Sequence, residues 1–152
     1  MKLTKNLSLA EVTKSATAIR MGIANTPSAT HLIALKEVSK NIFQPCREHF
    51  GKPLAVTSGY RSEALNEAIN GSKTSQHSKG EALDLDADVF GGFSNAELFN
   101  YIKDHLDFDQ LIWEFGNNNN PAWVHCSYKT RGNRNEVLIA IKTNNQTTYR
   151  KL

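Results

Sequence analysis

The residues best suited to chemistry lie between Ser75 and Asp84. This stretch, SQHSKGEALD, holds His77 and Asp84, and a second histidine, His125, follows much later in the segment Trp-Val-His. Imidazole nitrogens and carboxylate oxygens are zinc ligands, and three protein ligands leave a fourth position for water. By residue type and spacing alone, the three residues form either a catalytic zinc site or an unrelated loop histidine, strand-face aspartate and core histidine.

A strand and a hairpin must position these side chains. Residues 81–88 alternate acids with apolar residues over their second half, the period-two pattern of a strand with one wet and one buried face. The polar loop 72–80 leads His77 into this strand. Residues 110–115 and 123–128 are aromatic-rich runs separated by a glycine, four asparagines and a proline, which predicts a hairpin with a long polar loop. His125 would therefore reach the strand from a neighbouring hairpin.

The remaining elements are mostly helical in the first half of the chain. Two capping boxes, at Ser8–Glu11 and Ser94–Glu97, predict helices that begin there. Further helices and strands are expected from periodicity and turn residues. The expected helices are 8–21, 27–51 with Pro27 in its first turn and a kink at Pro45, 62–69 and 94–106, and the other strands are 54–57 and 137–141. This order predicts one α+β domain over residues 1–152, with N-terminal helices packed on a small, mostly antiparallel sheet.

Composition places the chain among ordinary globular domains. The 152 residues are 39% hydrophobic and 22% charged, so one core can form without metal or disulfide support. Eighteen basic against 15 acidic residues give a net charge of +3, with no cluster of five basic residues, so no nucleic-acid partner is expected. Cys46 and Cys126 fit no metal or disulfide pattern and are expected to be reduced, packed thiols. The N-terminus lacks the apolar core of a signal peptide and no run is long enough to span a membrane, so we expect a protein made in the cytoplasm without membrane insertion. No feature of the sequence indicates an oligomer, and a monomer is the default expectation.

Three ordered motifs resemble the M15 zinc peptidases. SQHSKGEALD matches the SxHxxGxAxD signature of that family, and Ser58–Ser62 (SGYRS) and Trp123–His125 (WVH) resemble its flanking motifs. The resemblance covers about Leu9–Tyr128, and the segments SATA, MGI and NTP near the N-terminus are similar to the compact phage and prophage branch. It implies the M15 or Hedgehog-like peptidase fold and one Zn²⁺ held by His77, Asp84 and His125.

The resemblance also implies roles for two further residues. Arg61 matches an arginine that faces the substrate, where its guanidinium would hold a carbonyl or carboxylate and stabilise developing negative charge. The alternative is a surface arginine paired with Glu63 or Glu67. Ser75 matches a motif serine that would bind the substrate or orient the loop, and a hydroxyl that only stabilises the turn is equally compatible with its position.

The general base is where the chain departs from better-known M15 members. These often carry an acid three residues before the last histidine ligand, and Ala122 stands there. A hairpin register that pairs 113 with 126 would place Glu114 opposite His125, so we predict Glu114 as the base that accepts a proton from water and delivers it to the leaving amine. The alternatives are a solvent-exposed Glu114 and, as a second candidate base, Asp86.

The expected activity is zinc-assisted hydrolysis of an amide bond in peptidoglycan peptide stems by a phage or prophage endolysin that reaches the cell wall after release. A D-alanyl-D-alanine carboxypeptidase or dipeptidase is the nearest alternative, because Arg61 could meet either a free carboxylate or an internal carbonyl. A virion-associated cell-wall-binding protein that keeps the fold without turnover is the third, because Ala122 replaces the usual acid.

Overall fold

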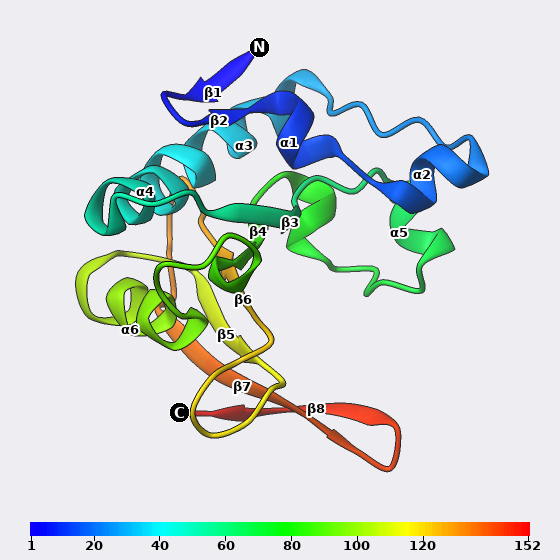
Figure 1. The fold of residues 1–152 in the computed structure, drawn as a ribbon. Coiled ribbons are helices and arrows are strands. Elements are labelled where there is room, and N and C mark those ends of the chain that lie inside the picture. Colours follow the sequence, from blue (N-terminus) through cyan, green and yellow to red (C-terminus); the bar gives the residue numbers. More distant parts are fainter.

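The computed structural model describes all residues, 1–152, and confirms an α+β fold (Figure 1). The helical elements are α1 (Leu9–Thr13), α2 (Ala16–Met21), α3 (Ala29–Val38), the π-helical turn η1 (Ser39–Phe43), α4 (Gln44–Phe50), α5 (Glu63–Ala68), the 3₁₀ turns η2 (Gln76–Lys79) and η3 (Ala87–Val89), and α6 (Asn95–His105). The strands are β1 (Lys2–Thr4), β2 (Leu7–Ser8), β3 (Ala55–Ser58), β4 (Ala82–Asp86), β5 (Gln110–Glu114), β6 (Trp123–Ser127), β7 (Glu136–Thr143) and β8 (Gln146–Lys151).

Six strands form the main sheet, in the order β3-β4-β6-β5-β7-β8. All neighbouring strands are antiparallel except β5 and β7, which are parallel. β1 and β2 form a separate two-stranded sheet at the N-terminus. The mostly antiparallel sheet and the β5–β6 hairpin are therefore as predicted.

The sheet has one covered face and one face that carries polar groups. In β4 and β6 alternate side chains point to opposite faces. Leu83, Leu85, Val124 and Cys126 enter the main core together with apolar side chains of α3, η1, α4 and α6. Figure 1 shows these helices gathered on one side of the strands. The residues between these apolar ones, Asp84 and His125 among them, are consequently on the opposite face.

The helix predicted over 27–51 forms with two differences. Pro27 lies outside it, because Ser28 is the N-cap and its side chain accepts a hydrogen bond from the backbone N–H of His31. In place of a simple kink at Pro45 the helix widens into η1 just before this proline, which has no N–H to donate to the preceding turn. Gly51 ends the helix in the left-handed conformation, at φ +62°.

Two other predictions of element bounds were wrong. The helix expected over 8–21 is split into α1 and α2, because Lys14 is extended and Ser15 caps a new helix by accepting a hydrogen bond from the N–H of Ala18. Strand β8 was not predicted at all. Asn144 and Asn145 both adopt positive φ, the conformation of a two-residue hairpin turn, and join β7 to β8.

Cys46 and Cys126 are buried, unpaired thiols in the core, as predicted. None of the helices combines the length and apolar character that crossing a membrane requires.

Candidate metal and catalytic site

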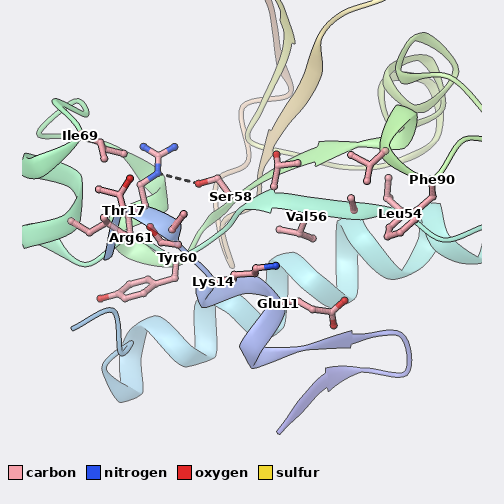
Figure 2. A pocket seen from close by; sticks show the side chains of 16 residues that line it. Glu11, Lys14, Thr17, Leu54, Val56, Ser58, Tyr60, Arg61, Ile69 and Phe90 are labelled. Carbon is pink, nitrogen blue, oxygen red and sulfur yellow. Dashed lines mark hydrogen bonds between the residues drawn. The ribbon is translucent and has the colours of Figure 1, made fainter. Parts of the chain in front are cut away.

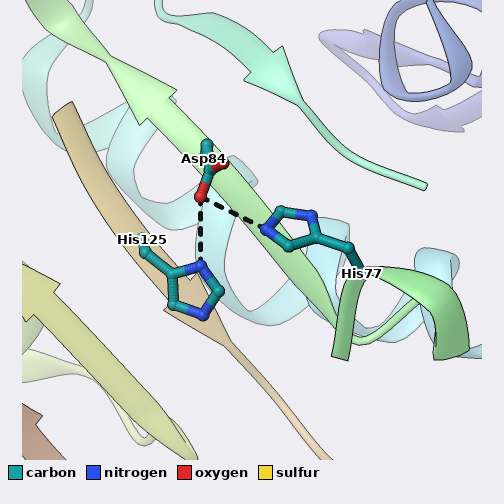
Figure 3. A group of neighbouring side chains, drawn as sticks. All are labelled: His77, Asp84 and His125. Atoms are coloured by element: carbon teal, nitrogen blue, oxygen red, sulfur yellow. Dashed lines mark hydrogen bonds and ion pairs between the residues drawn. The ribbon is translucent and has the colours of Figure 1, made fainter. Parts of the chain in front are cut away.

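Three potential ligand side chains converge on the polar face of the sheet (Figure 3). His77 lies in η2, Asp84 in the middle of β4, and His125 in β6, where the register pairs it directly with Asp84. Asp84 Oδ1 is 3.0 Å from His125 Nδ1 and 3.3 Å from His77 Nε2. All three residues are at least 91% buried, and their ligand atoms lie within 4.8 Å of one another.

The surroundings of this cluster fit a zinc site. Atoms that bind one tetrahedral zinc at about 2.0–2.1 Å are about 3.3 Å apart, close to the two distances between Asp84 Oδ1 and the histidine nitrogens. His77 Nδ1 is 2.6 Å from the carbonyl oxygen of Gly59, which can only accept, so Nδ1 carries the proton and Nε2 faces the cluster. Metal-binding histidines typically make this second hydrogen bond, which sets their tautomer and orientation. His77, Asp84 and His125 would therefore hold the ion.

Arg61 completes the environment of Asp84. One guanidinium nitrogen lies 3.6 Å from Asp84 Oδ2, the oxygen that faces away from the histidines, while Nε donates to Ser58 Oγ at 3.2 Å. Although burial opposes ionisation of Asp84, His77 and His125 hold its pKa well below its usual range. Asp84 is therefore a carboxylate, the form that binds a metal.

The glycines of the two motifs are required by close packing. Gly80 adopts φ +74° and ends η2, and a Cβ at this position would overlap the carbonyl oxygen of His31. A Cβ on Gly59 would overlap the backbone of Val12. Both glycines therefore let helices approach the loops that hold the His77 ring.

Glu114 lies on the same face as the cluster, although not in the predicted register. Ile112 pairs with His125, and Glu114 pairs with Trp123, a shift of two residues. A shift of two preserves the face, so Glu114 is diagonal to His125 rather than opposite to it. It is 7% exposed on an interior strand, so it is not a solvent-exposed edge residue.

The environment of Glu114 suits a proton acceptor. Burial, assisted by the negative charge of Asp84 and opposed by His125 and Arg61, raises the pKa of the Glu114 carboxyl to about 7. A general base acts best when its pKa lies near the working pH. Asp86, the second candidate base, instead accepts hydrogen bonds from Asn95 Nδ2 and the N–H of Asp88 and braces the start of α6.

The other two predicted residues lie at the site in different ways. Arg61 pairs with Asp84 and contacts Asn66 Oδ1 at 3.5 Å; it makes no ion pair with Glu63 or Glu67. Ser75 lines the same cleft, but its hydroxyl accepts a hydrogen bond from the N–H of His77 and so caps η2.

An open cleft of about 850 Å³ surrounds the cluster. It extends from Arg61 and the 70–79 loop across β6 and β5 to the C-terminal hairpin. A separate, more apolar cavity of about 640 Å³ lies on the other side of Arg61, between the first helices and β3 (Figure 2). Arg61 therefore stands at the boundary between the polar cleft and this cavity.

A hydrogen-bonded network around the buried Asp109, beside the loop that carries His77, was not predicted. Asp109 is fully buried and accepts hydrogen bonds from Gln76 Nε2, from the backbone N–H of Arg134, and from two nitrogens of the Arg134 guanidinium, the shortest at 2.7 Å. Gln76 precedes His77 and also donates to Glu81. No motif marks Asp109 or Arg134, because their pairing depends on loops that are 25 residues apart.

Residues 5–127 match the family model described as Peptidase M15, which covers more than half of the chain and includes all three ligand candidates. The chain belongs to the peptidase M15 family. M15 peptidases are zinc-dependent, so this M15 protein is a metallopeptidase with a peptide as its substrate, and its His-Asp-His cluster is able to bind a metal. No curated protein matches this M15 chain.

Proposed function

We propose that this M15 protein hydrolyses an amide bond in the peptide stems of bacterial peptidoglycan, as a phage or prophage endolysin that uses one Zn²⁺. The position of Glu114 carries the proposal: a buried carboxyl with a pKa near 7 lies on the same sheet face as the three candidate ligands. Hydrolysis needs a base as well as a metal site, whereas a protein that only binds the cell wall does not.

Each residue has a defined part in this mechanism. Zinc held by His77, Asp84 and His125 would supply a Lewis acid that activates water and polarises the amide carbonyl. Glu114 accepts the proton of the attacking water and returns it to the leaving amine. Arg61 holds a substrate oxygen and stabilises the negative charge that develops on it. Ser75 orients the His77 loop and is available to the substrate at the cleft wall.

The charge of the cleft supports a substrate that carries carboxylates. Four cationic side chains, of Arg61, Lys79, Lys129 and Arg134, line it against the three carboxyls of Glu81, Asp84 and Glu114, and the two lysines have no carboxylate partner in the chain. Peptidoglycan stems carry free carboxylates, which such a cleft would attract.

We further propose that the protein acts as a monomer on the cell wall after release from the cytoplasm in which it is made.

The nearest rival activity is removal of terminal D-alanine. Arg61 is the observation that favours it, because a guanidinium fork also binds a terminal carboxylate. The two activities differ in the bond that is cut and not in the groups that cut it.

Digestion of purified peptidoglycan by the zinc-loaded protein tests the proposal. Mass spectrometry should find new termini at L-alanine and D-glutamate, and released D-alanine would instead support the carboxypeptidase. His125→Ala should be inactive and Glu114→Gln should lose about 10²- to 10⁴-fold in turnover, but only His125→Ala should lose metal binding. A wild-type protein that binds zinc and releases no product would overturn the proposal.

A further inference from the structure

The last two strands form a wall of the cleft although they lie outside the matched segment. The family model ends at residue 127, whereas β7 and β8 cover Glu136–Thr143 and Gln146–Lys151. Tyr149 and Thr147 of β8 nevertheless line the cleft that contains the metal cluster. Figure 1 shows this hairpin beyond β5, at the end of the molecule far from the N-terminal helices.

The strand register directs Tyr149 toward the site. Glu114 pairs with Ala140 across the parallel β5–β7 ladder, and Ala140 pairs with Tyr149 across the antiparallel β7–β8 ladder. Directly paired residues point to the same face of a sheet. Tyr149 is therefore in the same row as Glu114 and, beyond it, Trp123.

The residue between Glu114 and Tyr149 is small. Ala140 is fully buried beside Ile112 and Leu138 and carries only a methyl group, so no long side chain stands between Tyr149 and Glu114 in this row. Tyr149 itself is 57% exposed and lines the cleft. Burial, together with the negative charges of Glu114 and Asp84, raises the pKa of Tyr149, so the phenol stays protonated and able to donate a hydrogen bond.

The distance across the sheet sets which part of a peptide Tyr149 can meet. From His125 on β6 to Tyr149 on β8 there are three strand intervals, about 14 Å at 4.7–4.9 Å each. An extended peptide covers about four residues over this length. Because the tyrosine side chain itself reaches part of the way, it meets a residue two or three positions from the cleaved bond.

We infer that Tyr149 forms a binding subsite for an extended peptide, and that its hydroxyl donates a hydrogen bond to a carbonyl or carboxylate oxygen two or three residues from the scissile amide, on the side away from Arg61. This inference rests on the proposed peptidase function and deepens it. The hairpin then selects for substrate length: a peptide of four or five residues occupies the subsite, and a dipeptide does not reach it.

Paired substrates that share one scissile bond test the inference. KM for a tetra- or pentapeptide stem should rise about 3- to 10-fold in Tyr149→Phe, the loss expected for one hydrogen bond, and further in Tyr149→Ala. KM for the matching dipeptide, and kcat for both, should stay within about twofold. Arg150→Ala is the matched control, because Arg150 is exposed, follows Tyr149 directly and pairs with Ile139 on the opposite face.

Binding without turnover provides a second readout. Calorimetry with the zinc-loaded Glu114→Gln protein should show weaker binding of the intact tetra- or pentapeptide when Tyr149→Phe is added. Equal binding, or an equal loss for the long peptide and the dipeptide, would overturn the inference. If the wild-type protein cleaves neither substrate, the proposed function fails, while this binding comparison still decides whether the subsite exists.

Discussion

Replacement of Glu114 by glutamine should stabilise the metal-free protein at alkaline pH while it removes catalysis. Burial raises the pKa of Glu114 to about 7, above the ordinary value for a glutamate of 4.5. A group whose pKa is raised by folding contributes stability below its unfolded pKa and loses it as the pH rises through the folded pKa. Above pH 7 the folded protein therefore contains a poorly solvated carboxylate.

The size of this effect follows from the shift. A difference of about 2.5 pKa units corresponds to about 3 kcal/mol at 1.36 kcal/mol per unit. Glutamine has nearly the same shape without the charge, so Glu114→Gln should raise the free energy of unfolding at pH 8 by up to about 3 kcal/mol and have little effect at pH 4. For a domain of this size the gain corresponds to roughly 6–12 °C in Tm.

Urea unfolding of the chelator-treated protein at pH 4, 6 and 8 measures this directly. Glu67→Gln is the matched control, because Glu67 is exposed on α5 and its replacement should be neutral at each pH. Zinc should reduce the advantage of Glu114→Gln, since a nearby dication favours the ionised carboxylate. The reasoning is refuted if the difference between Glu114→Gln and wild type does not grow with pH. Turnover should fall by about 10²- to 10⁴-fold, with metal affinity retained.

Three further changes probe the ligand cluster and its support. His125→Ala should abolish both zinc binding, measured by calorimetry, and activity; stoichiometric zinc binding by this variant would remove His125 from the ligand set. Gly80→Ala should cost about 1–3 kcal/mol in urea unfolding and weaken zinc binding, because a methyl group overlaps the carbonyl oxygen of His31 and the φ of +74° disfavours alanine. Arg134→Ala should destabilise the fold by about 1–3 kcal/mol at pH 7, because the buried Asp109 carboxylate loses the charged hydrogen bonds of a half-exposed arginine, and unchanged stability would contradict this.

The residues of the candidate metal cluster and most elements could be predicted from sequence because their motifs and patterns are local. Capping boxes marked the starts of α1 and α6, and alternation in β4 separated Asp84 from the leucines that enter the core. His77, Asp84 and His125 were named from a motif, and the structure places them together. The reduced state of Cys46 and Cys126 could likewise be predicted from their spacing alone.

Local signals were less reliable where competing interactions decide the outcome. Ser15 was expected inside the helix over 8–21, but its side chain caps the start of a second helix, α2. The Asn144–Asn145 pair between two runs of strand-forming residues is a hairpin signal that could have revealed β8.

Sequence determined the face on which Glu114 lies, because alternation along a strand depends only on the backbone. Tertiary structure decided what lies opposite: the register is shifted by two residues from the simplest one, so Trp123, and not His125, pairs with Glu114. It also placed Tyr149 beside the cleft through the parallel β5–β7 pairing. Which residues meet across a sheet depends on loop geometry and core packing summed over distant segments, and no local pattern contains that information.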